Sequence, residues 1–88
     1  MVWDDVSYLL RSPLSKRILE CLVKQSPLTP FQISKETDIA RSNISTKLGQ
    51  LKKRGLVECV NPNSRKWRFY KITDKGKNVL SKAKGVKS

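Results

Sequence analysis

The residue types that most often perform catalysis are sparse in this sequence. It contains no histidine, the commonest general base and a frequent zinc ligand. The seven acidic side chains show no paired spacing for acid–base chemistry, and no glycine-rich loop that would cradle a phosphate is present. The sequence therefore indicates that the protein is not an enzyme, and it predicts neither a metal site nor a cofactor.

Two cysteines, Cys21 and Cys59, have a spacing that matches no metal-binding or redox motif. Both lie in short apolar stretches, so we interpret them as reduced, small hydrophobic residues of the core. A disulfide between them is the alternative. Asp4 and Asp5 stand where a signal peptide would be basic, and no apolar run approaches the roughly 20 residues of a membrane span. We therefore expect a reducing, cytoplasmic location and no membrane partner.

The basic residues could bind phosphate groups, and they are unevenly distributed along the chain. Nineteen lysines and arginines stand against seven acidic residues, which gives a net charge of +12 over 88 residues. Residues 1–40 carry five side chains of each sign, whereas residues 41–88 carry fourteen basic and two acidic ones. This one-sided charge is typical of a protein that binds a phosphate backbone. A solvated basic face without a partner is the alternative.

The spacing of apolar and polar residues predicts a single, mainly α-helical domain with a two-stranded β-hairpin, which is an α+β fold. With 88 residues, of which 38% are hydrophobic, the chain can form one core but not two. We expect helices at residues 1–11, 13–24, 30–37, 41–54 and 74–84, a tight turn at 38–40, and strands at 56–60 and 67–72.

Start and stop signals support these bounds. Ser12 and Thr29 each precede a proline and are placed to cap a helix, and Gln32 completes a capping box with Thr29. Gly55 ends the helix over 41–54. The apolar stripes predicted to pack inward are Leu14, Ile18, Cys21 and Leu22 with Leu19 at the edge, then Ile44, Leu48 and Leu51, and finally Val79, Leu80 and Ala83.

The outer face of the helix over 41–54 carries small, amide and basic side chains. Ser42, Asn43, Thr46 and Gln50 could read base edges, because amides bond adenine in a bidentate way and a threonine methyl can touch a thymine methyl. Within a helix, Gly49 lowers the stability by about 1 kcal/mol relative to alanine. Close approach of another backbone or of DNA would explain a glycine here, and neutral drift is the alternative. The residues expected to hold phosphates are Arg41, Ser45, Lys47, Lys52, Lys53 and Arg54.

The predicted hairpin has a basic tip, which is formed by Arg65, Lys66 and Arg68. Basic side chains suit a narrow minor groove, although a charged hairpin also blocks edge-to-edge strand pairing. Strand alternation places Trp67 and Arg68 on opposite faces. We expect one aromatic face of the hairpin to pack on the last helix. Exposure of Trp67 would favour stacking on single-stranded nucleic acid.

The order of these elements is that of the winged helix-turn-helix fold. Residues 39–48 (IARSNISTKL) and 51–57 (LKKRGLV) closely resemble the recognition helix of winged-helix transcription regulators, and residues 71–76 (KITDKG) resemble their junction between wing and last helix. The resemblance is to the MarR-like and ArsR-like families, most closely to small archaeal members. It covers a core at residues 12–84, with residues 1–11 as an N-terminal helix and 85–88 as a tail of a single domain at residues 1–88.

This resemblance implies a regulator that binds double-stranded DNA, with the helix over 41–54 in the major groove and the wing on the adjacent minor groove or its phosphates. The cysteine-rich metal motif of the arsenic sensors is absent, so metal sensing is not implied. Regulators of this kind commonly dimerise through terminal helices, which makes Trp3, Val6 and Leu10 candidates for a homodimer contact. The same helix could instead cover the domain's own core.

We therefore predict a cytoplasmic, nucleoid-associated transcription regulator that reads specific sequences of double-stranded DNA. Two alternatives stay open. The first is a winged-helix module that binds RNA or a ribonucleoprotein. The second is a protein-interaction module whose basic half meets an acidic partner. The polar residues at the front of the helix over 41–54 favour DNA over a merely electrostatic partner.

Overall fold

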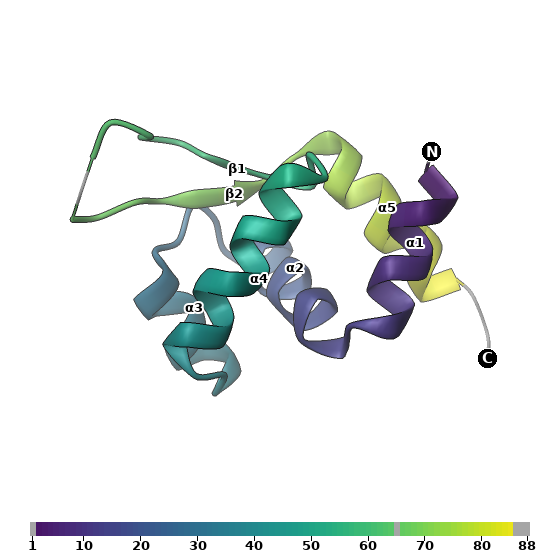
Figure 1. The fold of residues 1–88 in the computed structure, drawn as a ribbon, viewed down its shortest axis with the longest axis horizontal. Coiled ribbons are helices and arrows are strands. Elements are labelled where there is room, and N and C mark those ends of the chain that lie inside the picture. Colours follow the sequence, from purple (N-terminus) through teal and green to yellow (C-terminus); the bar gives the residue numbers. More distant parts are fainter. Residues whose placement is uncertain (1, 65, 86–88) are drawn as a thin grey trace.

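The computed structural model describes residues 2–64 and 66–85, so Arg65 and residues 86–88 of the predicted tail lie outside the described residues, while Gly85 ends the last helix. In the described part the order of elements is as predicted, and the bounds of the helices agree closely with the expectation (Figure 1). The elements are α1 (Val2–Arg11), α2 (Pro13–Lys24), α3 (Pro30–Thr37), α4 (Arg41–Lys53), β1 (Val57–Cys59), β2 (Tyr70–Ile72) and α5 (Asp74–Gly85).

Helix α2 forms the centre of the single hydrophobic core, since it packs against the four other helices and against β2. Ile18, Leu19 and Leu22 of α2 are fully buried. Leu19 is therefore a central core residue, and the prediction that it lies at the edge was wrong. Leu14 and Cys21 are only half-buried, because neighbouring elements cover more of the Leu19 face than the pattern of α2 alone indicates.

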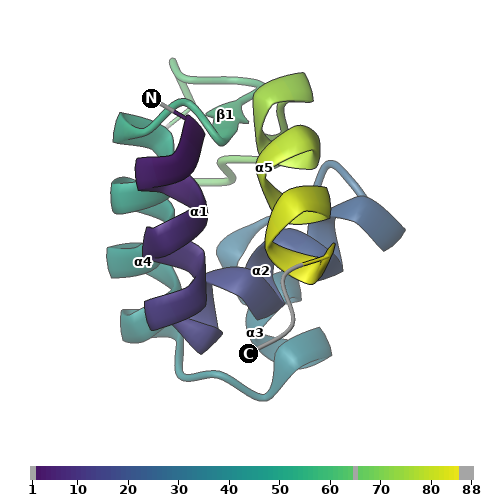
Figure 2. The same cartoon turned by 90° about the vertical axis from the view of Figure 1, so that its right-hand side faces the viewer.

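The two pairs of helices that flank α2 have different functions in the fold. Helices α1 and α5 pack side by side, as Figure 2 shows. Helices α3 and α4 form the helix-turn-helix pair.

Helix α3 begins with the predicted capping box. The Gln32 backbone N–H donates to Thr29 Oγ1 at 3.2 Å, and the Thr29 N–H donates to Gln32 Oε1 at 2.9 Å. The Ser12 hydroxyl makes no such cap on α2 and donates to Ser15 Oγ at 3.0 Å.

The hairpin is antiparallel, with Val57 opposite Ile72, but both strands are shorter than predicted. Beyond the short ladder, the Val60 N–H still donates to the Phe69 carbonyl at 2.8 Å, and the side chain of Asn61 adds two further hydrogen bonds. Its Oδ1 accepts from the Phe69 N–H at 2.8 Å, and its Nδ2 donates to the Trp67 carbonyl at 2.6 Å. The hairpin therefore stays closed along the extended arm seen in Figure 1 without regular strand structure.

A pairing that the sequence did not predict fixes the hairpin to the loop before α3. Leu28 and Tyr70 exchange two backbone hydrogen bonds, of 3.0 Å from the Leu28 N–H and 2.7 Å from the Tyr70 N–H. Tyr70 packs against the core, and β2 contacts α2. This contact sets the direction in which the wing leaves the core. That an aromatic face of the hairpin packs on the last helix stays a prediction.

The first turn of α5 packs tightly on the chain that leads into β1. The Thr73 N–H donates to the Leu56 carbonyl at 3.0 Å, and the Thr73 hydroxyl accepts from the Gly76 N–H at 2.9 Å, so Thr73 caps α5. A Cβ atom on Gly76 would lie 2.1 Å from the Leu56 carbonyl oxygen and 2.7 Å from Ile72 Cγ1. Glycine is therefore the residue that fits at this junction.

We expect Gly76→Ala to lower the free energy of unfolding by about 1–3 kcal/mol or more, as overpacking does, because a backbone carbonyl cannot swing away. Gly49→Ala is the matched control, since no described atom lies within 4 Å of its added Cβ. This control should gain up to about 1 kcal/mol of helix propensity. Urea unfolding followed by circular dichroism measures both changes. Similar effects of the two substitutions would contradict the close packing of α5 on Leu56.

Candidate nucleic-acid interface

Helix α4 buries its predicted apolar face and presents the predicted base-reading face to solvent. Ser42, Asn43, Thr46 and Gln50 are all exposed. The Thr46 hydroxyl donates to the Ser42 carbonyl at 3.0 Å, so its hydrogen is used within the helix while the methyl group is left for other contacts. Gly49 lies on this face, and no atom of the described chain would meet a Cβ atom there within 4 Å. Close packing against the protein's own backbone therefore does not explain this glycine.

A groove of about 390 Å³ separates α4 from the hairpin. It is lined by Pro30, Ser45, Leu48, Lys66, Arg68 and Tyr70. The groove brings together residues for which the sequence predicts different roles. Ser45 is predicted to hold a phosphate, whereas Lys66 and Arg68 are predicted to belong to the wing. Arg68 is positioned by its Nε, which donates to the Ser64 carbonyl at 3.0 Å. The sequence could not show this groove, because it depends on where the hairpin joins the core.

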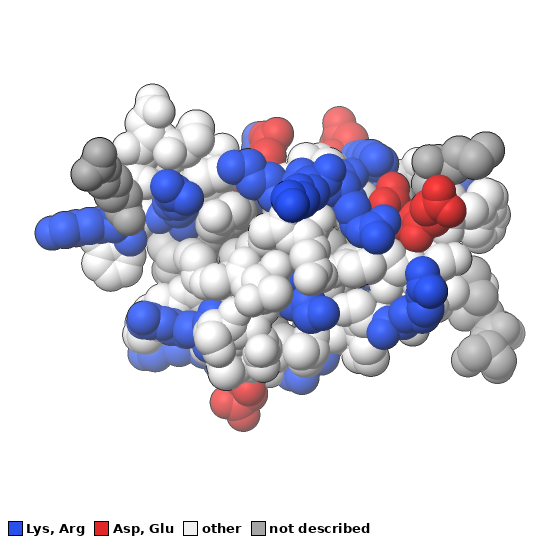
Figure 3. All heavy atoms as spheres, in the orientation of Figure 1, with Lys and Arg blue, Asp and Glu red and all other residues white. Residues whose placement is uncertain are grey.

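The other basic residues predicted to hold phosphates differ in their surroundings. Arg41, Lys52 and Lys53 are exposed, whereas Lys47 is half-buried. The Arg41 guanidinium lies 5.7 Å from the ring centroid of Phe31, which is itself exposed instead of packing into the core. Figure 3 shows basic side chains spread across this face of the molecule from the hairpin towards α1.

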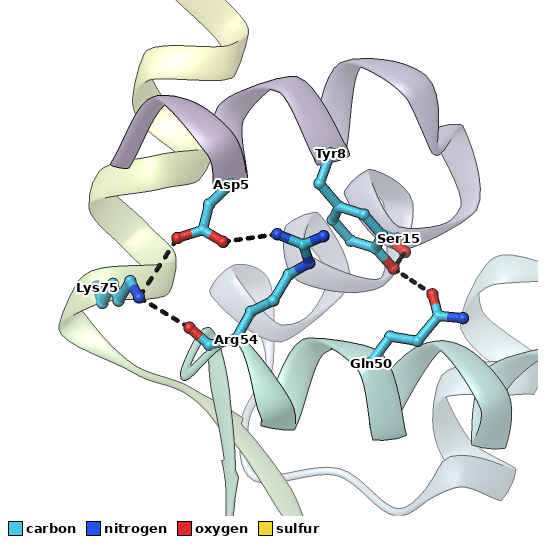
Figure 4. A network of polar contacts seen from close by, with 6 residues as sticks. All are labelled: Asp5, Tyr8, Ser15, Gln50, Arg54 and Lys75. Atoms are coloured by element: carbon cyan, nitrogen blue, oxygen red, sulfur yellow. Dashed lines mark hydrogen bonds and ion pairs between the residues drawn. The ribbon is translucent and has the colours of Figure 1, made fainter. Parts of the chain in front are cut away.

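Arg54, the last of the predicted phosphate-binding residues, is held inside a network around the buried carboxylate of Asp5 (Figure 4). The Asp5 side chain is 7% exposed, and its two oxygens lie 3.0 Å from Arg54 Nη1 and 3.3 Å from Lys75 Nζ. Lys75 also donates to the Arg54 carbonyl at 2.9 Å. From its place in the first turn of α1, Asp5 would be expected only to suit the helix dipole. No local pattern could identify partners from α4 and α5.

Tyr8 of α1 connects this network to the exposed face of α4. The Arg54 guanidinium lies 4.1 Å from the Tyr8 ring centroid. The Tyr8 hydroxyl donates to Gln50 Oε1 at 2.6 Å and lies 2.8 Å from Ser15 Oγ, as Figure 4 shows. The carbonyl of Gln50, a predicted base-reading residue, therefore already accepts one hydrogen bond within the protein.

The three residues predicted to contact a second copy of the chain are not equally accessible. Trp3 and Leu10 are 63% and 46% exposed on α1. Val6 is 1% exposed and packs in the protein's own core, so it is not available for a contact with a second copy. Its selection as a dimer candidate was wrong, because α1 turns this residue towards the rest of the core.

Both cysteines are free thiols, so the alternative of a disulfide between them was wrong. Each is half-buried and not fully enclosed in the core. Burial raises the pKa of the Cys21 thiol, and the nearby negative charge of Glu36 raises it further. Over residues 2–64 and 66–85, no three or more acidic or cysteine side chains gather in a way that could hold a metal ion. None of the helices in that part is both long and apolar enough to cross a bilayer.

Sequence comparison identifies one family. The model of the bacterial regulatory proteins of the arsR family matches residues 8–58, which is more than half of the chain. The match runs from α1 through α4 into β1 and so includes the whole helix-turn-helix pair. No curated protein matches the chain in sequence.

Several solved structures share the fold. The chain is similar to the transcriptional repressor CouR bound to a 23-mer DNA duplex, with 26% identity, a TM-score of 0.76, and coverage of 96% of this chain and 63% of CouR. BldR from Sulfolobus solfataricus is 23% identical with a TM-score of 0.76, and the match covers 97% of this chain and 64% of BldR. MarR from E. coli is 23% identical with a TM-score of 0.73, and the match covers 97% of this chain and 70% of MarR. The chain spans only about half of other matched structures, 49% and 52% of two of them. These matches confirm the predicted winged helix-turn-helix fold and the likeness to MarR-type regulators.

We expect Asp5→Asn to lower the free energy of unfolding by about 1–3 kcal/mol, the usual effect of removing a charged partner from a buried hydrogen bond. Glu58→Gln is the matched control, because the Glu58–Lys71 pair, at 3.1 Å, is about half exposed at both side chains. Exposed pairs contribute about 0–1 kcal/mol. Urea unfolding of both variants checks the difference. If the two substitutions lower the free energy of unfolding equally, Asp5 is not the buried link between α1, α4 and α5.

Proposed function

The chain belongs to the arsR family of bacterial regulatory proteins, and from that premise we propose that it regulates transcription by binding specific sequences of double-stranded DNA. Members of this family are DNA-binding transcription regulators and not enzymes, and the similar protein CouR is described on a DNA duplex. The observation that carries the proposal is the exposed polar face of α4 beside a groove lined by basic side chains of the hairpin. DNA binding of this kind would also place the protein on the nucleoid.

In this proposal α4 enters the major groove and reads base edges with Ser42, Asn43, Thr46 and Gln50. The exposure of all four side chains supports this role, as does the open space around Gly49, which would let a DNA strand approach closely. The N-terminal end of α4 has no side-chain cap at Ala40. Its free backbone N–H groups would favour a phosphate oxygen at the edge of the groove.

The basic residues around α4 hold the phosphate backbone in this arrangement. Lys66 and Arg68, together with Arg65 outside the described residues, form the wing that reaches the adjacent minor groove or its phosphates. We assign Arg54 to the protein's own structure, because its guanidinium is paired with Asp5. The remaining residues proposed to hold phosphates are Arg41, Ser45, Lys47, Lys52 and Lys53.

We further propose that the protein binds DNA as a homodimer. One copy would contact few base pairs, and paired half-sites are the usual solution for helix-turn-helix proteins. The exposed Trp3 and Leu10 on α1 supply an apolar contact for a second copy, with Val6 now left out. Sedimentation of the wild type at micromolar concentration tests this directly. A purely monomeric protein would contradict the dimer.

Selection of bound duplexes from a random DNA pool, at a stated salt concentration, tests the proposed function. An enriched palindromic motif is expected, because two copies related by a two-fold axis read two equivalent half-sites. An enriched motif without symmetry would support sequence-specific binding and contradict the dimer. Equal recovery of all sequences would contradict sequence-specific regulation and favour a module whose basic half meets an acidic protein partner.

One observation favours a second candidate function, the binding of RNA or another single-stranded nucleic acid. Trp67 is 61% exposed on the hairpin, between the basic residues Lys66 and Arg68. Exposed aromatic rings beside basic groups stack on unpaired bases, with a contribution of about 1–3 kcal/mol per base. Binding of Trp67→Ala to a duplex and to a single strand of the same sequence separates the candidates. A larger loss on the single strand, together with tighter wild-type binding to it, would favour this second function.

The proposed phosphate contacts predict a strong dependence of DNA affinity on salt. If about six to ten phosphates are neutralised, the affinity should fall by roughly 10³–10⁵ between 50 and 200 mM salt, because condensed counterions are released on binding. Fluorescence anisotropy with a labelled duplex measures the slope of log K against log salt concentration. A flat response would rule out binding through the DNA backbone.

Base reading and backbone binding can be separated by two substitutions. Asn43→Ala should weaken the binding free energy by about 1–3 kcal/mol on the selected duplex and by little on random DNA, because an amide distinguishes base edges. Lys66→Ala should weaken both complexes by similar factors and reduce the salt slope by about one. Binding curves on two DNAs at two salt concentrations measure all four quantities. Equal losses for Asn43→Ala on both DNAs would remove it from the base-reading set.

A further inference from the structure

We propose that Tyr8, outside the helix-turn-helix pair, is a positioning residue that fixes Gln50 as a hydrogen-bond donor towards DNA. The inference deepens the proposed function and rests on it. Its basis is a directed chain of hydrogen bonds that begins at the start of α2, passes through α1 and ends on the exposed face of α4. The acceptor that Gln50 would bind is an oxygen or nitrogen atom of DNA, on a base edge or on a phosphate.

The direction of this chain follows from counting hydrogens. The Tyr8 hydroxyl has one hydrogen, and it donates that hydrogen to Gln50 Oε1 at 2.6 Å. In the 2.8 Å contact between Tyr8 and Ser15, the donor must therefore be Ser15. Ser15 in turn accepts from the Ser12 hydroxyl at 3.0 Å. Each of the three hydroxyls thus donates its hydrogen to the next residue, and this series of hydrogen bonds ends at the carbonyl of Gln50.

Tyr8 itself is held in place by its neighbours. The guanidinium of Arg54 covers its ring at 4.1 Å, and Arg54 is fixed by the buried Asp5. Ser12 and Ser15 are both buried. The hydroxyl that bonds Gln50 is therefore already held in place before DNA binds, so little conformational entropy is lost there on binding.

The consequence for recognition is a restriction on what Gln50 presents. An unrestrained glutamine bonds adenine with both its carbonyl and its NH₂ group. Here the carbonyl already accepts from Tyr8, while among the described residues Nε2 of Gln50 donates to none. The Tyr8 bond uses one of the two lone pairs of the carbonyl oxygen and fixes the orientation of the amide. In that orientation Gln50 offers mainly donors, which suit N7 and O6 of guanine, O4 of thymine or a phosphate oxygen, and which oppose the amino group of cytosine. The bidentate adenine contact expected from the sequence is thereby disfavoured at this residue.

A double-mutant cycle tests the proposal, using the whole 88-residue chain and the duplex selected by the wild type. Tyr8→Phe keeps the ring under Arg54 and removes only the hydroxyl. We expect it to weaken binding about two- to tenfold, the range for one net hydrogen bond. In a Gln50→Ala background the same substitution should have no further effect. The matched control is an Asn43→Ala background, where Tyr8→Phe should weaken binding by its full factor, because the Tyr8 hydroxyl bonds Gln50 and Ser15 and not Asn43.

A scrambled duplex identifies the acceptor, and unfolding in urea confirms that the variants are folded at the assay temperature. Coupling between Tyr8 and Gln50 on the selected duplex alone indicates a base edge, and equal coupling on both duplexes indicates a phosphate oxygen. Random-pool selection with Tyr8→Phe should also raise the frequency of adenine at one position of each half-site. If Tyr8→Phe acts equally with and without Gln50, or not at all, the proposal is overturned. Failure of the wild type to bind any duplex would contradict the proposed function itself.

Discussion

The buried carboxylate of Asp5 is the interaction on which the arrangement of the helices depends. A chain with a net charge of +12 resists compaction, since its basic segments repel one another. Asp5 brings one oxygen to Arg54 at the end of α4 and the other to Lys75 at the start of α5. Lys75 also binds the carbonyl of Arg54, so the two helix ends are joined directly. One acidic side chain from α1 thereby holds the two cationic segments together.

The position of α4 follows from this junction, and the interface follows from the position of α4. With one end tied to α1 and α5 and its apolar face on α2, the helix must present its polar face to solvent. The hairpin leaves the core beside it, because Tyr70 pairs with Leu28, and a groove lies between them whose hairpin side carries the basic residues Lys66 and Arg68. The residues that could contact bases are thus mounted on a rigid helix, while most of the charges that could hold phosphates lie around it.

Much of this architecture is predictable from the sequence, because helix starts and apolar stripes are local signals. The Thr29–Gln32 capping box is an example, since both of its partners lie within one turn. Contacts between distant segments gave no such signal. An acidic Asp5 near a helix start suits the helix dipole whether or not it is buried, and nothing near Leu28 indicates a strand-like pairing. The exposed face of α4 was predicted, but the hydrogen bond that restrains Gln50 comes from a residue 42 positions away.

The central claim is that the exposed face of α4 and the neighbouring hairpin bind DNA together, and amide chemical shifts test it most directly. The protein has a mass of 10.1 kDa, which suits ¹⁵N-labelled NMR. Titration with the selected duplex should shift the amides of residues 41–50, 60–61 and 63–68 most strongly, together with the amide of the pairing residue Leu28. Shifts confined to α1 and α5, with α4 and the hairpin unchanged, would contradict the account.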